Sequence, residues 1–431
     1  MGRLFALIFL CTAFAARAQT FDTSATLALK YFKEAEIAGK NQQIWKAPLY
    51  GPTLFVEPVT RATYANEPDS AGILKPEAGI FKGVLPKDVM IANTSIRWQD
   101  KMWSVILWPL PTTPDERISL VLHESFHRIQ NDIGFSQRSP TADHLSSMNG
   151  RIYFLLELRA LSAALAKPVT NRRDDISNAL LFREKRHQLF PATYKNEEIL
   201  EMNEGIAEYT GMILGREKNN IRSHLFHQLD TAGQRKSLIR SSAYITGPVY
   251  GYLLYEKFPG WTQQVDSNSN FPELVSNYYH TGLRQKASET AIAEIIRKYN
   301  GAAIINTEKL NEQKRQLMAS NYIRLFTQKP VLTIKLEKMG ISFNPNTLFD
   351  LGKSGTVYPT AEVKDVWGKL TVSAVGMLMK DWKIISLPAS EELKQDGQLI
   401  EGNGWKLTLN DHWKLTKIDP LHFELIKKSS P

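Results

Sequence analysis

The sequence predicts an α+β protein, in which a small sheet and a helical bundle are followed by a C-terminal antiparallel β domain. Three patterns along the chain predict this fold class. Short strand-like runs separated by Gly and Pro occupy residues 21–112, helical periodicity dominates residues 113–328, and apolar and polar residues alternate over residues 329–431. The length of 431 residues suits two or three such domains.

Residues 1–18 have the pattern of a secretory signal peptide. Arg3 precedes an apolar run over residues 4–15, and the small residues Ala16 and Ala18 form a cleavage signal. The apolar run is too short to anchor the chain across a bilayer. We therefore predict cleavage after residue 18 and export to a periplasmic or extracellular location.

Cysteine usage restricts the chemistry of any metal site. Cys11 is the only cysteine, and it lies within the predicted signal peptide. The exported chain would then have no thiol and no disulfide, so a bound metal needs His, Asp or Glu ligands. Hydrophobic residues at 43% and charged residues at 23% fit a globular protein.

The charge distribution excludes some classes of partner. The formal net charge of +9 becomes +7 when Arg3 and Arg17 leave with the signal peptide (9 − 2 = 7). Lys and Arg are scattered, with no basic stripe that contains aromatic residues, so we expect no nucleic-acid partner. A mildly basic surface is compatible with association with an anionic envelope surface. No later apolar stretch is long enough to cross a membrane.

The N-terminal subdomain, residues 21–112, supplies the predicted small sheet. A helix is expected over residues 24–39, and strands are expected over residues 53–57, 89–93 and 102–108. The last strand, within the run MWSVILWPLP, is almost entirely apolar and is followed directly by proline. We therefore expect its sheet to be covered on at least one face.

The helical subdomain, residues 113–328, is predicted to hold the metal site. Its main expected helices span residues 116–133, 145–166, 171–189, 195–214, 248–258 and 303–326. The β domain, residues 329–431, contains alternating runs at residues 332–336, 369–375 and 405–416. We predict that the last run is a hairpin that turns near Asn410. No catalytic group of residues is visible in the β domain.

The segment HESFH at residues 123–127 fits the pattern H-E-x-x-H. On a helix, residues four apart lie on one face, so His123 and His127 can bind the same tetrahedral ion. Glu124 then lies beside the ion, where it can take a proton from the attacking water and pass it to the leaving amine. The surrounding residues are apolar, as expected for a buried helix.

A second segment, EMNEGIAEYTG at residues 201–211, resembles the N-E-G-x-A-x-Y segment of aminopeptidase-N-type gluzincins. These zinc metallopeptidases complete the metal site with the glutamate of that segment. The resemblance implies a zincin-like catalytic domain with one Zn²⁺ and with Glu204 as the third ligand. Thermolysin-like gluzincins hold a ligand histidine through a carboxylate four residues further on. Glu208 has that place here, although thermolysin has Asp.

The sequence allows two other interpretations of the glutamates near the metal motif. Glu201, Glu204 and Glu208 have the spacing of a solvated acidic helix face. Glu157 lies in an apolar helix, where an unpaired carboxylate is unfavourable, so it could be the third ligand, an outer partner of the site or a partner of Arg159. We rank Glu157 behind Glu204, because LELRAL does not resemble a ligand segment.

A third segment, YITGPVYGYLL at residues 244–254, resembles the Tyr-x-x-Gly segment of the same aminopeptidases, whose tyrosine stabilises the oxyanion of the intermediate. The resemblance implies this role for Tyr244, and a core or surface tyrosine is the alternative. Pro248 is expected to begin the helix and to leave Tyr244 just outside it.

The resemblance is limited to these three segments. The chain places 76 residues between His127 and Glu204, many more than those aminopeptidases do, and it lacks their Gly-x-Met-Glu-Asn strand. Aminopeptidase specificity is therefore not implied. We expect a zinc peptidase that acts on peptides or proteins and binds them along a sheet edge formed by residues 102–108. A zinc hydrolase of another amide or ester bond and a non-catalytic envelope binding protein are the alternatives.

Overall fold

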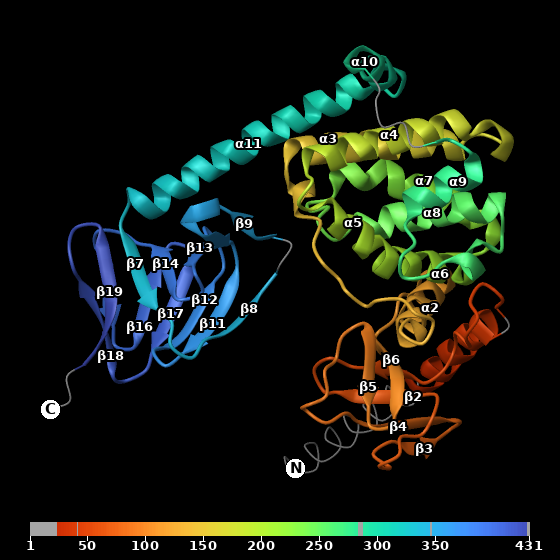
Figure 1. Ribbon diagram of the computed structural model, residues 1–431. Helices are drawn as coiled ribbons and strands as arrows, with labels where there is room; N and C mark the ends of the chain where they lie inside the picture. Colours follow the sequence, from red (N-terminus) through yellow and green to blue (C-terminus); the bar gives the residue numbers. More distant parts are fainter. Residues whose placement is uncertain (1–23, 41, 283–287, 345–346, 429–431) are drawn as a thin grey trace, which may run out of the picture. The chain divides into compact units, whose positions relative to one another are not determined.

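The computed structural model describes residues 24–40, 42–282, 288–344 and 347–428. The predicted signal peptide and Cys11 lie outside these residues. The α+β class is confirmed, and the chain divides into two compact units, Met1–Ile304 and Ile305–Pro431 (Figure 1). This division falls within a helix rather than at residues 328–329, where the sequence pattern changes. Among the described residues, no helix has both the length and the apolar character needed to span a bilayer.

The first unit contains a six-stranded sheet in the order β3-β4-β2-β1-β6-β5. Its strands are β1 (Thr53–Val56), β2 (Ala62–Ala65), β3 (Lys75–Glu77), β4 (Ile80–Val84), β5 (Thr94–Trp98) and β6 (Lys101–Leu107). Strands β1 and β6 are parallel, and the other neighbours are antiparallel. The apolar β6 is paired on both sides, so β5, and not the strand predicted over residues 102–108, forms the sheet edge near β6.

The predicted strand over residues 89–93 is wrong, because the strand of this region is β5, which begins at Thr94. Val89 and Ile91 pack against the core without strand pairing. The side-chain oxygen of Asn93 accepts the backbone N–H of Leu107 at 2.8 Å, where a strand would use its own carbonyl. The apolar residues of this segment therefore belong to a loop that packs on the core, not to a strand of the sheet.

Period-two alternation divides this sheet into two buried faces. Leu54 and Val56 contribute to one apolar cluster, whereas Phe55 between them contributes to the other. The helix over residues 24–40 covers the second face, where Phe32 stacks on Phe55 with ring centroids 4.1 Å apart. The same face carries helix α2 (Pro114–Ile129), through Val121.

The remaining helices of this unit form the bundle. They are α3 (Met148–Leu165), α4 (Arg173–Leu189), α5 (Tyr194–Leu200), α6 (Ile206–Gly215), α7 (Lys218–Thr231), α8 (Ala243–Lys257), α9 (Phe271–Tyr279) and α10 (Glu289–Lys298). The expectation that Pro248 starts a helix is wrong: α8 begins at Ala243 and includes Tyr244. Proline cannot bond the carbonyl four residues earlier, which is that of Tyr244, but the first turn of α8 forms without that bond.

Glycines allow the helices that carry the candidate site to approach closely. An added Cβ at Gly211 of α6 would lie 2.3 Å from the carbonyl oxygen of Ser119 in α2. An added Cβ at Gly247 of α8 would lie 2.3 Å from the Cα of Gly205. Real Cβ atoms do not approach other heavy atoms so closely, so these crossings require residues without side chains.

The second unit includes most of helix α11 (Gly301–Thr327), which is followed by two sheets around one core. One sheet has the order β18-β19-β7-β14-β13-β10-β9, and the other has the order β15-β16-β17-β12-β11-β8. Their strands are β7 (Val331–Lys335), β8 (Gly340–Phe343), β9 (Phe349–Asp350), β10 (Thr356–Tyr358), β11 (Ala361–Asp365), β12 (Gly368–Val372), β13 (Met377–Lys380), β14 (Ile384–Pro388), β15 (Gln395–Asp396), β16 (Leu399–Gly402), β17 (Trp405–Leu409), β18 (Trp413–Lys417) and β19 (His422–Lys427).

Two features of this unit differ from expectation. Strands β7 and β19 are parallel, whereas the other pairs of the two sheets are antiparallel. The predicted hairpin near Asn410 is wrong, because β17 pairs with β12 and β16 while β18 pairs with β19. The short link at Asn410 therefore carries the chain from one sheet to the other, which the alternation of the two strands cannot reveal.

Candidate metal centre

Helix α2 places two imidazoles one turn apart. Pro114 begins the helix, Asp115 and Glu116 lie in its first turn, and basic residues lie in its last turn, which are all favourable positions. Its buried face contacts the sheet and α6, and the Oγ of Ser104 in β6 donates to the Glu124 carbonyl at 3.2 Å. The residues of the H-E-x-x-H segment are therefore held between the sheet and the bundle.

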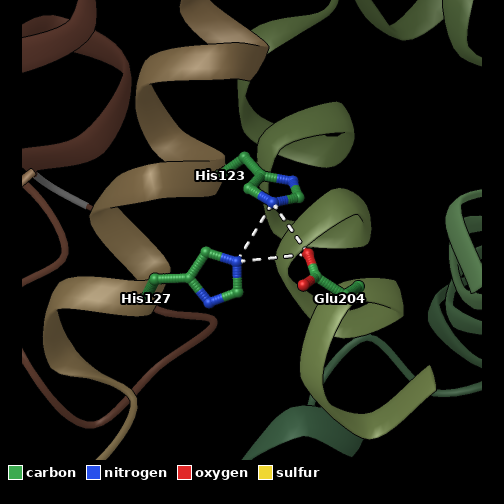
Figure 2. Close-up of side chains that lie close together, drawn as sticks. All are labelled: His123, His127 and Glu204. Atoms are coloured by element: carbon green, nitrogen blue, oxygen red, sulfur yellow. Dashed lines mark hydrogen bonds and ion pairs between the residues drawn. The ribbon is translucent and has the colours of Figure 1, made fainter. Parts of the chain in front are cut away.

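Three ligand atoms converge beside this helix (Figure 2). The Nε2 atoms of His123 and His127 are 3.1 Å apart, and they lie 3.6 and 3.5 Å from the Oε2 of Glu204. A tetrahedral zinc ion about 2.0–2.2 Å from each of three ligands keeps those atoms roughly 3.3–3.6 Å apart. The His₂Glu set and its spacing therefore fit one zinc ion, and these residues could hold it.

Glu204 lies in a widened helical turn. Residues Glu201–Gly205 form a π-helical segment between α5 and α6, so residues 194–215 are one continuous helical run. π-Segments of this kind are rare and occur frequently at functional sites. Here the turn directs Glu204 to the Nε2 side of His123, while Glu208 reaches the opposite ring nitrogen.

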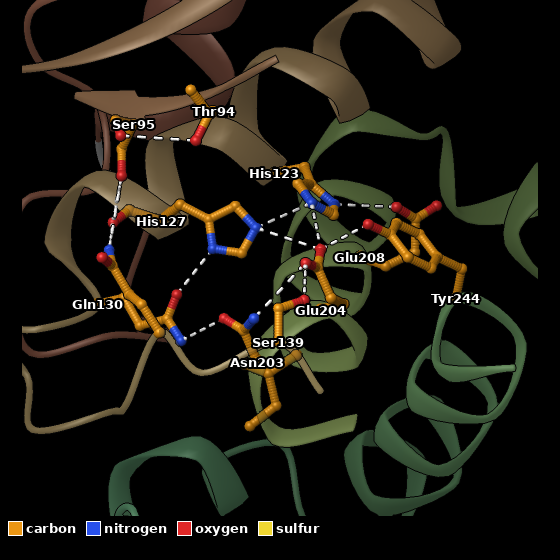
Figure 3. A network of polar contacts seen from close by, with 12 residues as sticks. Thr94, Ser95, His123, His127, Gln130, Ser139, Asn203, Glu204, Glu208 and Tyr244 are labelled. Atoms are coloured by element: carbon orange, nitrogen blue, oxygen red, sulfur yellow. Dashed lines mark hydrogen bonds and ion pairs between the residues drawn. The ribbon is translucent and has the colours of Figure 1, made fainter. Parts of the chain in front are cut away.

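Each histidine has a partner on its other ring nitrogen (Figure 3). The Nδ1 of His123 lies 3.0 Å from the Oε2 of Glu208, and the Nδ1 of His127 lies 2.7 Å from the Oε1 of Gln130. The Gln130 amide in turn donates to the Oδ1 of Asn203 at 2.8 Å. If Nδ1 carries the proton in both rings, each Nε2 keeps its lone pair directed at the site.

The carboxylate of Glu204 is hydrogen-bonded through both oxygens. Tyr244 donates to Oε2 at 2.5 Å, and Ser139 donates to Oε1 at 3.1 Å. Arg240 approaches Oε1 at 3.4 Å. Burial alone would raise the pKa of Glu204, but hydrogen bonds with His123 and His127 lower its pKa well below the usual range. Glu204 is therefore ionised, as a metal ligand would need to be.

Electrostatics tune the groups around the ligands. Burial opposes protonation of His123, but hydrogen bonds to Glu204 and Glu208 raise its pKa to about 10 in the metal-free site. Burial raises the pKa of Glu124, against the lowering effect of the two imidazoles. The Glu124 side chain is buried, and among the described residues its Oε2 has no hydrogen-bond partner. That oxygen is therefore free to accept a proton.

These groups line a cleft with a volume of ≈ 340 Å³. Its lining residues are Asn93, Thr94, Ser95, His123, Glu124, His127, Gln137, Ser139, Asn203, Glu204, Arg240 and Tyr244. None of these side chains is aliphatic, and the lining of the cleft is mainly polar.

Glu157, the alternative third ligand, belongs to a separate buried hydrogen-bond network. Its carboxylate accepts hydrogen bonds from Arg186 at 2.6 Å and from the Tyr250 hydroxyl at 2.6 Å, in a fully buried network. The predicted partner Arg159 instead lies 3.6 Å from Asp230. Glu157 is a paired core carboxylate and is not part of the three-residue group.

The structure brings together the five residues singled out from the sequence, which are His123, Glu124, His127, Glu204 and Tyr244. It adds four that sequence reasoning missed, namely Gln130, Ser139, Asn203 and Arg240. Gln130 lies three residues after His127 on one helix, and Asn203 directly precedes Glu204, so helical spacing could have indicated both. Ser139 and Arg240 precede their helices and leave no such signal.

Comparisons with known proteins provide no relative for this chain. No protein-family model matches the sequence, and no curated protein or solved structure matches it. The function therefore has to be inferred from the chemistry of the site.

Proposed function

We propose that this chain is an exported zinc-dependent metallopeptidase of the gluzincin type, with a zincin-like catalytic domain. One observation carries the proposal. Two imidazole nitrogens and one carboxylate oxygen have the mutual spacing of ligands to a single ion, and the Oε2 of Glu124, which has no hydrogen-bond partner among the described residues, belongs to a side chain that lines the same cleft. Export rests on the signal-peptide pattern of residues 1–18.

A bound zinc ion would supply Lewis-acid polarisation of the scissile carbonyl and of the attacking water. Glu124 acts as the general base that takes the proton of this water and returns it to the leaving amine. Burial raises the pKa of Glu124 above that of an exposed carboxyl, which makes its carboxylate a stronger base toward the proton of the water.

Tyr244 donates a hydrogen bond to the oxyanion that develops on the substrate. Its hydroxyl lines the cleft, and its one proton, which is donated to Glu204 in the free site, turns to the oxyanion when substrate is bound. Burial and the neighbouring carboxylates raise the pKa of Tyr244, so the hydroxyl stays protonated at neutral pH. A hydroxyl donor held beside the reacting carbonyl stabilises the charge of the transition state more than the neutral ground state.

The substrate backbone binds along β5, whose outer edge has no partner strand among the described residues. Thr94 and Ser95 of this strand line the cleft, and Ser95 also bonds the carbonyl of His127 at 3.1 Å. An extended peptide can add to such an edge through backbone hydrogen bonds, which places a peptide bond above the ligands.

The test uses the purified full-length chain, zinc analysis and mass-spectrometric mapping of cleavage in a mixed peptide library. We expect one zinc per chain and cleavage that a chelator abolishes. Glu124→Gln should keep the zinc and lose activity by about 10²–10⁴-fold, whereas His127→Ala should lose both. His412→Ala, an exposed histidine of the second unit, is the matched control and should retain both.

The outcomes separate the alternatives. Bound zinc without peptide cleavage contradicts the peptidase, and Glu124-dependent cleavage of model amides or esters would then identify a different zinc hydrolase. Absence of stoichiometric zinc contradicts both and favours a binding protein.

A further inference from the structure

The charged groups of the cleft give it a positive balance once a metal is bound. Among the lining residues, Glu124 and Glu204 are acidic and Arg240 is basic. With a divalent ion the net charge is about +1 if both carboxylates are ionised. Apart from the two histidines, the other lining side chains are polar and uncharged. The cleft can therefore offer a substrate hydrogen bonds and the Arg240 cation, and it has no aliphatic side chain for an apolar group to pack on.

Arg240 is placed to meet a substrate. Its side chain is 51% exposed, and its guanidinium donates to the Ser139 carbonyl and hydroxyl at 3.2 and 2.8 Å. The remaining contact, to the Oε1 of Glu204, is long at 3.4 Å. A guanidinium has five N–H donors in a planar fork, so donors are left for a carboxylate.

Metal binding would free this side chain further. A ligand carboxylate shares its charge with the ion, so the attraction between Glu204 and Arg240 weakens. An incoming carboxylate can then form the stronger, two-pronged pair with the guanidinium. Two more exposed arginines lie close in the chain to the cleft lining: Arg97, two residues after Ser95 on β5, and Arg138, next to Ser139.

We infer, on the basis of the proposed function, that the substrates are anionic peptides, and that Arg240 selects a carboxylate close to the scissile bond. The carboxylate comes either from an acidic side chain or from the C-terminus of the substrate. Both present the same planar anion to the guanidinium, so the experiment must separate them.

The experiment compares peptides that differ only in this group. Once a cleaved bond is known, internally quenched peptides carry Glu or Gln beside it, each with a free or an amidated C-terminus. We expect wild-type kcat/KM to favour one carboxylate form by at least about tenfold, which corresponds to one charge-assisted hydrogen bond. Arg240→Gln should bring this ratio close to one, and Arg240→Lys should restore part of it.

A matched variant and a binding measurement complete the design. Arg297→Gln removes the same charge from the exposed face of α10 and should leave the ratio unchanged. Fluorescence anisotropy with Glu124→Gln measures peptide affinity without turnover, and the affinities should follow the same order. The preference should also decline as salt concentration rises.

Three results would overturn the inference. Equal cleavage of acidic and neutral peptides by the wild type rejects carboxylate selection and leaves the peptidase intact. Loss of zinc in Arg240→Gln, with an equal loss of activity on all peptides, shows that Arg240 only holds Glu204. If no peptide is cleaved, the proposed function falls, and equal affinities in the anisotropy titration then reject carboxylate recognition independently.

Discussion

Each ligand of the candidate metal centre is oriented by a further side chain, and these orienting groups differ in charge. A carboxylate, Glu208, holds His123, whereas an amide, Gln130, holds His127. A carboxylate partner makes an imidazole more basic than an amide partner does. Burial opposes protonation of His123, but its hydrogen bonds to Glu204 and Glu208 raise its pKa.

Zinc binding should therefore release a proton from His123. Its pKa of about 10 in the metal-free site means that the ring is protonated at pH 7.5, and zinc requires the neutral ring. Zinc affinity should accordingly rise as pH increases from 7 to 10. Isothermal titration calorimetry in two buffers with different ionisation enthalpies should detect about one proton released per zinc. Glu208→Gln should reduce this release, and an unchanged value in that variant would contradict the assignment to His123.

Tyr244→Phe tests the oxyanion donor. At saturating zinc we expect kcat to fall by about 10²–10³-fold with little change in KM, because the lost hydrogen bond strengthens only in the transition state. Tyr255→Phe on the same helix lies outside the cleft lining and serves as the control. A larger KM with an unchanged kcat would mean that Tyr244 binds substrate rather than stabilising the intermediate.

The sequence predicts which residues share the site when they lie within one or two helical turns of one another. His123 and His127 follow from a single helical turn, and Glu208 follows from Glu204 by the same rule. Arg240 lies 36 residues from Glu204 along the chain and meets it only through the fold. Glu157 shows the opposite case: its apolar neighbours indicate a functional carboxylate, but a buried arginine on another helix neutralises it.

At the scale of elements, the site depends on two helix crossings that have no room for side chains. Gly205 directly follows the ligand Glu204, and it faces Gly247, three residues after Tyr244. The backbone contact between these glycines therefore fixes the distance between Glu204 and Tyr244, the proposed third ligand and the proposed oxyanion donor. The close approach of Gly211 to the Ser119 backbone likewise fixes the distance between helices α6 and α2.

Gly247→Ala should disturb both groups at once. Its Cβ would lie 2.3 Å from the Cα of Gly205 and 2.6 Å from its carbonyl carbon, so a helix must move. We expect a loss of about 1–3 kcal/mol in unfolding free energy, together with weaker zinc binding and lower kcat. Urea denaturation and zinc titration provide the measurements. Gly233→Ala is the control, since its nearest neighbours are 3.8 and 3.9 Å away, and it should change neither.

Several elements were not predictable because tertiary contacts override the local pattern. The π-segment Glu201–Gly205 has ordinary helical residues, and its widened turn becomes evident only in the folded structure. Val89 and Ile91 resemble a strand but pack as a loop. The two alternating runs on either side of Asn410 resemble a hairpin, yet their partner strands lie in different sheets. Alternation shows which side chains of a strand are buried, and it does not show which strand is its neighbour.

At the scale of the whole molecule, the chain contains two compact units with separate cores. The first unit holds the two faces of the six-stranded sheet and the helical bundle, and the second holds the core between its two sheets. Among the described residues, the one group able to hold a metal lies entirely in the first unit. The change of hydrophobic period near residue 329 predicts where the sheets of the second unit begin, since β7 starts at Val331.

Zinc should consequently stabilise one unit and leave the other unchanged. We expect differential scanning calorimetry of the full-length protein to resolve two transitions. Zinc at about 1,000 times its Kd adds roughly 4 kcal/mol to the unit that binds it, which should raise that transition by several degrees. A chelator should lower the same transition and leave the other in place.

The variant Glu204→Gln tests whether the shift of the transition depends on zinc bound at this site. It keeps the shape of the side chain but removes the ionised oxygen, so zinc should no longer shift either transition, while the second unit still unfolds at its original temperature. If the variant shifts both transitions, or if the wild type unfolds in a single transition that zinc raises as a whole, the units are energetically coupled. The second unit would then have to be counted as part of the scaffold that supports the metal centre.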